Sequence, residues 1–227
     1  MSTILLSGWA QPADALAHLA PDAKLFDYSD YSAANEAIEA LKAINPTHVI
    51  AWSLGGQLAL RGVAMGGLGL KHLTVIGAPL QFVSDATLKG MDPTTYQLFR
   101  DSYANDPIRT KARLHALIAK DDREMKRVMS MLSHHPKVDN VAHWLPWLED
   151  LAAHRLDVSA LASAPPTLII HGMNDAIVPF AQGEALAEAL PHAQLNAWAE
   201  VGHAPHMHDA PRLIAEITAH RHLHGVA

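Results

Sequence analysis

A strand–turn–helix pattern around residue 53 limits the fold of this chain more than any other feature of its sequence. Residues 47–51 (THVIA) form an apolar run of strand length, and residues 57–65 form a run rich in Ala and Leu that is typical of a helix. The turn between them contains Ser53, and a further apolar run follows at residues 72–77. A strand, a helix and a strand in this order predict parallel strands joined by a right-handed crossover.

This alternation of strands and helices is interrupted by a central segment that has a different composition. Residues 84–160 contain no convincing strand, are rich in Met, Leu, Arg and Lys, and are divided into several helices by Pro93, Pro107, Pro136 and Pro146. The other predicted elements are strands at residues 3–6, 24–28, 167–171 and 194–198 and helices at residues 32–44, 180–190 and 209–222. We therefore predict a mostly parallel α/β core with flanking helices, formed by residues 1–83 and 161–227, with a helical lid inserted at residues 84–160.

Composition excludes several classes of protein. A chain of 227 residues with 49% hydrophobic content can bury a large core without disulfides or metals. It has no cysteine, which excludes a cysteine nucleophile and a thiolate zinc site. The net charge of −6 argues against nucleic-acid binding, and no apolar run approaches the roughly 20 residues of a membrane span. The first residues lack the basic and apolar regions of a signal peptide, so we expect a cytoplasmic protein. We also expect it to be a monomer.

The central segment is basic although the whole chain is acidic. Residues 100–137 carry nine Arg and Lys side chains, Lys137 being the last, and five Asp and Glu side chains, a net charge of +4. Arg109 and Arg113 are four residues apart, as are Arg123 and Arg127, which predicts that each pair lies on one helix face. The alternative explanation is an ordinary solvated helix surface.

Ser53 is the candidate nucleophile. It stands between an apolar strand and a helix of small residues, which is the context of a nucleophile elbow. Ala51 and Gly55, two residues before and after it, allow strand and helix to approach closely. The helix N-terminus stabilises negative charge that develops nearby. The alternative is that Ser53 only caps the helix.

A serine hydroxyl needs a general base, and the base needs an orienting carboxylate. In the fold that uses this elbow, the three residues follow the chain order Ser, Asp, His. Asp175 lies just after the strand at residues 167–171, at the edge of the sheet where ligands bind, and is the candidate acid. Its alternative role is that of a turn residue.

His203 is the candidate base because it lies on the loop after the last strand and directly follows Gly202. His206 and His208 are close rivals. The 16 histidines also suggest a metal site, at residues 203–208 or at His220, His222 and His224. Because neither group has a supporting carboxylate pattern or a His-Glu-x-x-His run, we predict no metal site and a solvated surface for the C-terminal group.

Acyl transfer builds negative charge on a carbonyl oxygen, which two backbone N–H groups usually stabilise. One should be the N–H of Leu54, the residue after the nucleophile. The other should come from the loop after the first strand, where the N–H of Trp9 is the candidate. Trp9 could equally be a core aromatic residue.

Four segments in chain order resemble the pimeloyl-[acyl-carrier protein] methyl ester esterases of biotin synthesis, which have the α/β-hydrolase fold. These segments are Ser7-Gly8-Trp9, the elbow at residues 51–56, the acid segment at residues 172–179 and the histidine segment at residues 201–205. The Trp-Ser-Leu-Gly-Gly elbow and the Gly-Trp loop are fairly specific, whereas many α/β-hydrolases share the other two segments. The likeness covers nearly the whole chain.

The resemblance implies a serine carboxylesterase that hydrolyses the methyl ester of a pimeloyl chain on acyl carrier protein, through a Ser-His-Asp triad and an acyl-enzyme and without a cofactor. It also implies that lid arginines bind the acidic carrier, which the basic segment would steer towards the site. Arg109 and Arg113 resemble the family's first arginine pair, and Arg123 and Arg127 are a looser match to the second. Trp144 and Trp147 are expected to line an acyl channel or to pack the lid.

The chain departs from the family pattern in two ways. It starts almost at the strand before Gly8, so the family's first two strands are expected to be absent, and Ser7 stands where histidine is common. Two other functions stay open. One is a general small-ester, lactone or thioester hydrolase with the same triad, and the other is a non-catalytic binding protein of the same fold.

Overall fold

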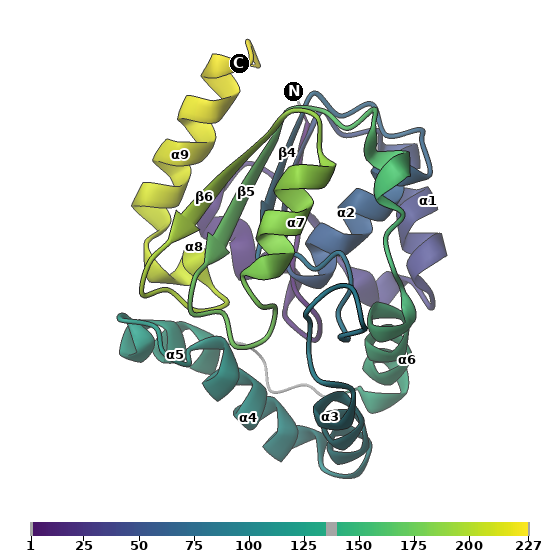
Figure 1. Cartoon of the computed structure of the whole chain (residues 1–227), viewed down its shortest axis with the longest axis vertical. Coiled ribbons are helices and arrows are strands. Elements are labelled where there is room, and N and C mark those ends of the chain that lie inside the picture. The colour runs from purple at the N-terminus through teal and green to yellow at the C-terminus, as the bar shows by residue number, and fades with distance from the viewer. Residues whose placement is uncertain (1, 135–139, 227) are drawn as a thin grey trace.

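A parallel sheet covered by helices forms the body of the protein (Figure 1). The computed structural model describes residues 2–134 and 140–226. Within them the sheet has six strands in the order β2-β1-β3-β4-β5-β6, and all neighbouring strands are parallel. The strands are β1 (Thr3–Leu6), β2 (Lys24–Phe26), β3 (His48–Trp52), β4 (His72–Ile76), β5 (Thr167–Gly172) and β6 (Ala193–Trp198).

The central strands are buried on both faces, which explains why their sequences are continuous apolar runs. Every residue of β3, β4 and β5 is buried. The helices outside the central segment are α1 (Ala34–Ile44), α2 (Leu54–Ala64), α7 (Ala181–Ala189), α8 (Pro205–His208) and α9 (Ala210–Leu223), with short 3₁₀ helices at Ala13–Leu19 and Tyr28–Asp30. A third 3₁₀ helix, Val158–Leu161, lies where the central segment ends. Figure 1 shows α7 and α9 on opposite sides of β5 and β6.

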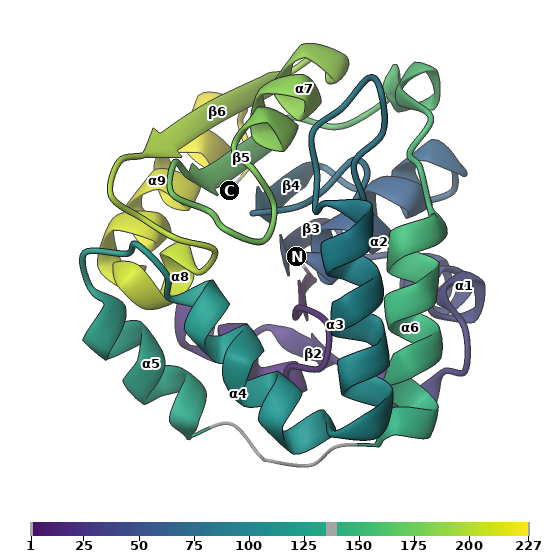
Figure 2. The same cartoon turned by 60° about the horizontal axis from the view of Figure 1, so that its bottom comes forward.

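The central segment consists mainly of helices that lie at the carboxyl ends of the strands. These are α3 (Pro93–Asn105), α4 (Pro107–Ile118), α5 (Met125–Ser133) and α6 (Val141–Ala153). Figure 2 shows them side by side across this end of the molecule. None of the helices in the described residues combines the length and the apolar character needed to cross a membrane.

Two prolines of the central segment mark helix boundaries as predicted, and one does not. Pro93 and Pro107 occupy the first turn of α3 and α4, where a missing N–H costs nothing, and the side chains of Asp92 and Asp106 cap these helices. Pro146 lies inside α6 rather than at a break, which corrects the prediction. Pro136 and Lys137 lie outside the described residues.

The predicted strands and the longer helices are confirmed, with small differences at their ends. The main difference is at the elbow, where α2 begins at Leu54 and not at residue 57, so Ser53 alone makes the turn. The prediction of a solvated surface for His220 is wrong. The residue is 3% exposed, and its Nδ1 lies 2.7 Å from Nε2 of His72.

Candidate active site

Ser53 makes the turn between β3 and α2 with a backbone conformation that non-glycine residues rarely adopt. Its φ is 55° and its ψ is −116°, and its N–H donates to the carbonyl of Ile76 at 2.9 Å. Its side chain makes no capping hydrogen bond to α2, so the structure does not support a role as a helix cap. The conformation instead points Oγ away from the helix amides and towards His203.

Small residues let α2 pack directly on the sheet behind Ser53. A Cβ atom on Gly55 would lie 2.4 Å from the carbonyl oxygen of Leu6, and one on Gly56 would lie 2.5 Å from the Cβ of Ala78. Both distances are too short for any side chain. The elbow therefore needs glycine at these positions for steric reasons.

The structure brings together the three side chains that the sequence pointed to. Nε2 of His203 lies 3.0 Å from Oγ of Ser53, and Nδ1 of His203 lies 2.7 Å from Oδ2 of Asp175. All three residues are buried, with exposures of 7%, 2% and 8% for Ser53, His203 and Asp175. Because a carboxylate can only accept, Nδ1 carries the proton that His203 donates to Asp175, which leaves the Nε2 of a neutral ring free to accept from Ser53.

The two oxygens of Asp175 have different partners. Oδ1 accepts from the backbone N–H groups of Ile177 (2.9 Å) and Val178 (2.8 Å), which builds the turn after β5. Oδ2 faces His203 and lies 3.5 Å from Nε2 of His171. Burial alone would raise the pKa of the Asp175 carboxyl, but His203 and His171 outweigh burial and hold this pKa well below its usual range. Asp175 therefore combines the turn role and the acid geometry that the sequence left as alternatives.

The rival histidines have other surroundings. His208 donates from Nδ1 to Oδ1 of Asp122 at 2.7 Å, and the ring of His206 packs against Trp52 with centroids 4.4 Å apart. Among the described residues, no group of three or more His, Asp or Glu side chains is arranged to hold a metal ion.

The two backbone amides predicted for the oxyanion hole lie on segments that flank Ser53. Leu54 is the first residue of α2, and its amide makes no hydrogen bond within the described part of the chain. The same holds for the amide of Trp9. The loop of Trp9 is anchored at the carbonyl of Ser7, which accepts from Gly55 N–H at 3.1 Å and from Tyr28 O–H at 2.9 Å. The indole of Trp9 also packs in the core against Tyr103, with ring centroids 4.8 Å apart.

An apolar cavity adjoins Ser53 and His203. The central segment supplies nearly half of its lining residues, among them Phe99 of α3, Leu114 and Leu117 of α4, and Leu148 and Leu151 of α6. The described residues that line it include no Asp, Glu, Lys or Arg. Trp144 and Trp147 do not line it and instead pack against Tyr28. The cavity therefore suits an uncharged hydrocarbon group next to the serine.

Sequence reasoning missed two residues that support the triad. The indole Nε1–H of Trp52 donates to the carbonyl of His203 at 2.9 Å, so the residue before the serine also holds the histidine loop. His171 lies beside Asp175 and contacts the carbonyl of Val178 at 2.9 Å through Nε2. The role of Trp52 has no local sequence signal, because it depends on a contact with a segment 151 positions away. His171 lies only four residues before Asp175, so its place at the end of the same strand is the signal that could have found it.

The four candidate arginines of the central segment are exposed, but only one of the two pairs lies on a single helix. Arg109 and Arg113 are both in α4 and border the same surface pocket. Arg123 precedes α5, which begins at Met125, so the prediction that it shares a helix face with Arg127 is wrong. The cause is a turn at Asp121 and Asp122 that delays the helix start, and the guanidinium of Arg123 lies 3.4 Å from Glu200 instead.

The chain is similar to relatives with known names. The chain is 32% identical over 183 residues to the pimeloyl-[acyl-carrier protein] methyl ester esterase of Aromatoleum aromaticum, covering 74% of this chain and 72% of that protein. It is 30% identical over 202 residues to the esterase of the same name from Methylococcus capsulatus, covering 86% and 78%. The match to the Nitrosomonas europaea esterase, 31% over 166 residues, covers 69% of this chain and spans 64% of that relative's length.

Solved structures show the same fold at lower sequence identity. An esterase from Exiguobacterium antarcticum superimposes with a TM-score of 0.76 at 17% identity, covering 96% of this chain and 91% of that one. A bromoperoxidase from Bacillus anthracis gives a TM-score of 0.74 at 16% identity, with the same coverage. Residues 5–217 match the Alpha/beta hydrolase family, and the named relatives above are esterases. The chain therefore belongs to the alpha/beta hydrolase family.

Proposed function

We propose that this protein is a serine carboxylesterase that hydrolyses the methyl ester of a pimeloyl chain carried on acyl carrier protein. One observation carries the proposal: the unbroken hydrogen-bonded line from Asp175 through His203 to Ser53, which ends at an apolar cavity. The names of the relatives support the substrate.

In the first half of the reaction, Nε2 of His203 accepts the proton of Ser53 Oγ as that oxygen attacks the ester carbonyl carbon. The ionised Asp175 stabilises the imidazolium that forms. The carbonyl oxygen becomes negative and accepts from the amides of Leu54 and Trp9. When the carbonyl re-forms, the bond to the methoxy oxygen breaks, His203 returns its proton to that oxygen, and methanol leaves.

In the second half, water replaces methanol. His203 Nε2 takes a proton from the water as its oxygen attacks the acyl-enzyme carbonyl, and then protonates Ser53 Oγ as the acyl–serine bond breaks. The products are the carboxylic acid, which then loses its proton to the solvent, and the original serine. No metal or cofactor takes part in either half of the reaction.

We propose that residues 84–160 act as the lid and that the carrier binds on it. This segment supplies nearly half of the residues that line the cavity, so an acyl chain in the cavity would contact it. Arg109 and Arg113 are exposed on α4, and Arg123 and Arg127 follow on the same segment. Acyl carrier proteins are acidic, so this basic surface has the complementary charge.

The direct test is conversion of purified pimeloyl-carrier methyl ester to the free acid, followed by mass spectrometry. We expect turnover by the wild type and none by Ser53→Ala. In cells, the wild-type gene should restore growth without biotin to a strain that lacks its own esterase, and Ser53→Ala should not. Failure of a fluorophosphonate probe to label Ser53 would instead indicate a binding protein.

A second experiment separates this substrate from small esters. Arg109→Glu with Arg113→Glu should lower turnover of the carrier substrate and leave hydrolysis of a short p-nitrophenyl ester unchanged. The matched control is Lys24→Glu with Lys71→Glu, an equal charge change on exposed residues at the amino ends of β2 and β4. If the arginine and lysine double variants turned over the carrier-bound ester equally well, a general small-ester hydrolase would be favoured.

A further inference from the structure

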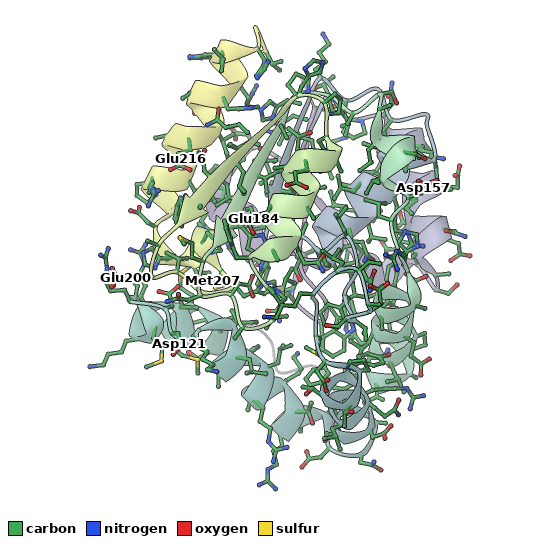
Figure 3. All side chains as sticks on the ribbon, in the orientation of Figure 1. Asp121, Asp157, Glu184, Glu200, Met207 and Glu216 are labelled. Carbon is green, nitrogen blue, oxygen red and sulfur yellow. The ribbon has the colours of Figure 1, made fainter. Side chains whose placement is uncertain are left out.

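The corner between α4 and α5, residues 118–124, is hydrogen-bonded to the loop that carries His203. We call these segments the α4–α5 corner and the histidine loop (residues 199–204). Figure 3 labels Asp121 on the corner and Glu200 on the histidine loop. The bonds between them run from His203 N–H to Ile118 O (3.1 Å), from Gly202 N–H to Asp122 Oδ2 (2.9 Å) and from Arg123 N–H to Glu200 O (2.8 Å). The corner therefore contacts the histidine loop over several consecutive residues.

Asp122 lies at the centre of this contact. Its carboxylate is fully buried, with 0% side-chain exposure, although it belongs to the helical segment and not to the sheet. Besides Gly202 N–H, it accepts from Glu124 N–H and from Nδ1 of His208, both at 2.7 Å to Oδ1. A buried carboxylate needs such donors because its desolvation is otherwise very costly. Asp122 thus joins the corner, the histidine loop and α8.

Gly202 makes this approach possible. A Cβ atom at this position would lie 2.8 Å from the carbonyl oxygen of Ile118 and 3.1 Å from that of Lys120. Any side chain would push the α4–α5 corner away from the histidine loop. The glycine next to His203 is therefore explained by the close passage of the corner.

We propose that Asp122 is a positioning residue for His203. This inference rests on the hydrolase function proposed above. Two consecutive backbone N–H groups of the histidine loop are fixed by the α4–α5 corner. Gly202 N–H donates to Asp122, and His203 N–H donates to Ile118 O. With this backbone fixed, the imidazole reaches both Asp175 and Ser53 at hydrogen-bond distance. Release of Gly202 frees the loop, and a displacement of about 1 Å in a catalytic group can cost roughly 100-fold in rate.

The test compares Asp122→Asn with Asp121→Asn. Asparagine has the shape of aspartate, but its NH₂ group must face either Gly202 N–H or the donors at Oδ1, so one set of bonds is lost. We expect kcat for a p-nitrophenyl ester to fall about tenfold or more, with KM nearly unchanged. Asp121→Asn makes the same chemical change on an exposed neighbouring side chain and should keep wild-type kcat.

A donor variant and a spectroscopic readout separate positioning from general stability. His208→Gln keeps an N–H donor for Asp122 and should retain more activity than His208→Ala. The downfield proton resonance of the His203–Asp175 hydrogen bond should shift or broaden in Asp122→Asn and stay in place in Asp121→Asn.

Wild-type kcat in Asp122→Asn would overturn the inference, even if the variant melts at a lower temperature, because that result would indicate a purely structural role. An inactive wild type that fluorophosphonate does not label would contradict the proposed function instead. The resonance would then still decide the role of Asp122, and an unchanged signal in Asp122→Asn would overturn it.

Discussion

Ser53 holds a strained backbone conformation that we attribute to its proposed role as nucleophile and not to stability. A φ of 55° with a ψ of −116° places the residue outside the regions that side chains favour, at a cost of about 1–3 kcal/mol. The surrounding structure maintains it through the Ser53 N–H bond to Ile76 and the close fit of Gly55. The benefit is an Oγ atom directed at His203.

This strain predicts an unusual result for Ser53→Gly. Glycine tolerates the conformation but increases the entropy of the unfolded chain, whereas alanine keeps the Cβ and its strain. We expect Ser53→Gly to be at least as stable as Ser53→Ala, measured by urea unfolding, with both inactive. At an unstrained position, the same exchange of alanine for glycine lowers stability by about 0.5–1 kcal/mol. A loss of that size here would show that Ser53 is not strained.

Single residues of the site were partly predictable. Ser53, Asp175 and His203 each follow a predicted strand, and the parallel order of the strands brings those ends to one edge of the sheet. What the sequence could not show was how Asp175 divides its two oxygens between a turn and a histidine. It also could not show that Trp52 bonds to His203 across 151 positions of the chain.

At the scale of elements, the packing of α2 on β1 depends on Gly55. Its missing side chain lets the helix lie against the backbone of Leu6. We expect Gly55→Ala to lower the melting temperature and to abolish esterase activity, because the added Cβ would meet backbone that cannot rotate away. Thermal unfolding and a p-nitrophenyl ester assay check both effects.

Gly62 in the same helix provides the control. A Cβ there would lie 2.6 Å from Cδ1 of Leu68, the far end of a flexible side chain. Alanine also favours the helix by about 1 kcal/mol over glycine. Gly62→Ala should therefore leave activity intact and stability equal or higher. Similar losses in both variants would contradict a specific role for Gly55.

The wall that α6 contributes to the cavity should set the acyl length. Leu148 lines the cavity, whereas Leu145, three residues earlier in α6, does not. We expect Leu148→Phe to lower kcat/KM for p-nitrophenyl esters of longer acids more than for the acetate, because the larger ring fills the space beyond the serine. Leu145→Phe should leave the ratio of the two activities unchanged. A parallel decrease for all esters would argue that the acyl chain binds elsewhere.

Elements were predictable where periodicity or a continuous apolar run was long enough. The buried strands β3, β4 and β5 were found this way. The 3₁₀ helix at Ala13–Leu19 and the one-turn α8 were not, since such short elements have no clear period. The start of α5 was misplaced because the carboxylate of Asp122 bonds to Glu124 N–H and holds the preceding turn.

At the scale of the whole molecule, the two ends of the sheet differ in character. The carboxyl ends of the strands carry the candidate active site. At the amino ends, His48 and His72 are the first residues of β3 and β4, pair in register, and are buried at 1% and 0% exposure. His220 of α9 covers them through its bond to His72. Figure 1 shows α9 running from near the carboxyl end of β6 to the amino-terminal side, where the chain termini lie.

These buried histidines predict that the fold loses stability in mild acid. Burial lowers the pKa of His48 to about 3, assisted by the charge of Arg221. Burial, together with His48 and His220, lowers the pKa of His72 to about 3 as well. In the unfolded chain both have a pKa near 6.5, so between about pH 6.5 and pH 3 the unfolded state binds more protons. The free energy of unfolding therefore falls with decreasing pH, by up to about 1.4 kcal/mol per pH unit for each histidine.

The measurement is urea unfolding at several pH values from 7 to 4.5 for the wild type and for His48→Gln with His72→Gln. The double variant removes both titrating groups, so its stability should depend less steeply on pH, even if it is lower at pH 7. His222→Gln is the matched control, because His222 lies on α9 but is exposed, and it should keep the wild-type slope. Equal slopes for the wild type and the double variant would contradict this explanation, because the acid sensitivity would then have to arise from groups other than His48 and His72.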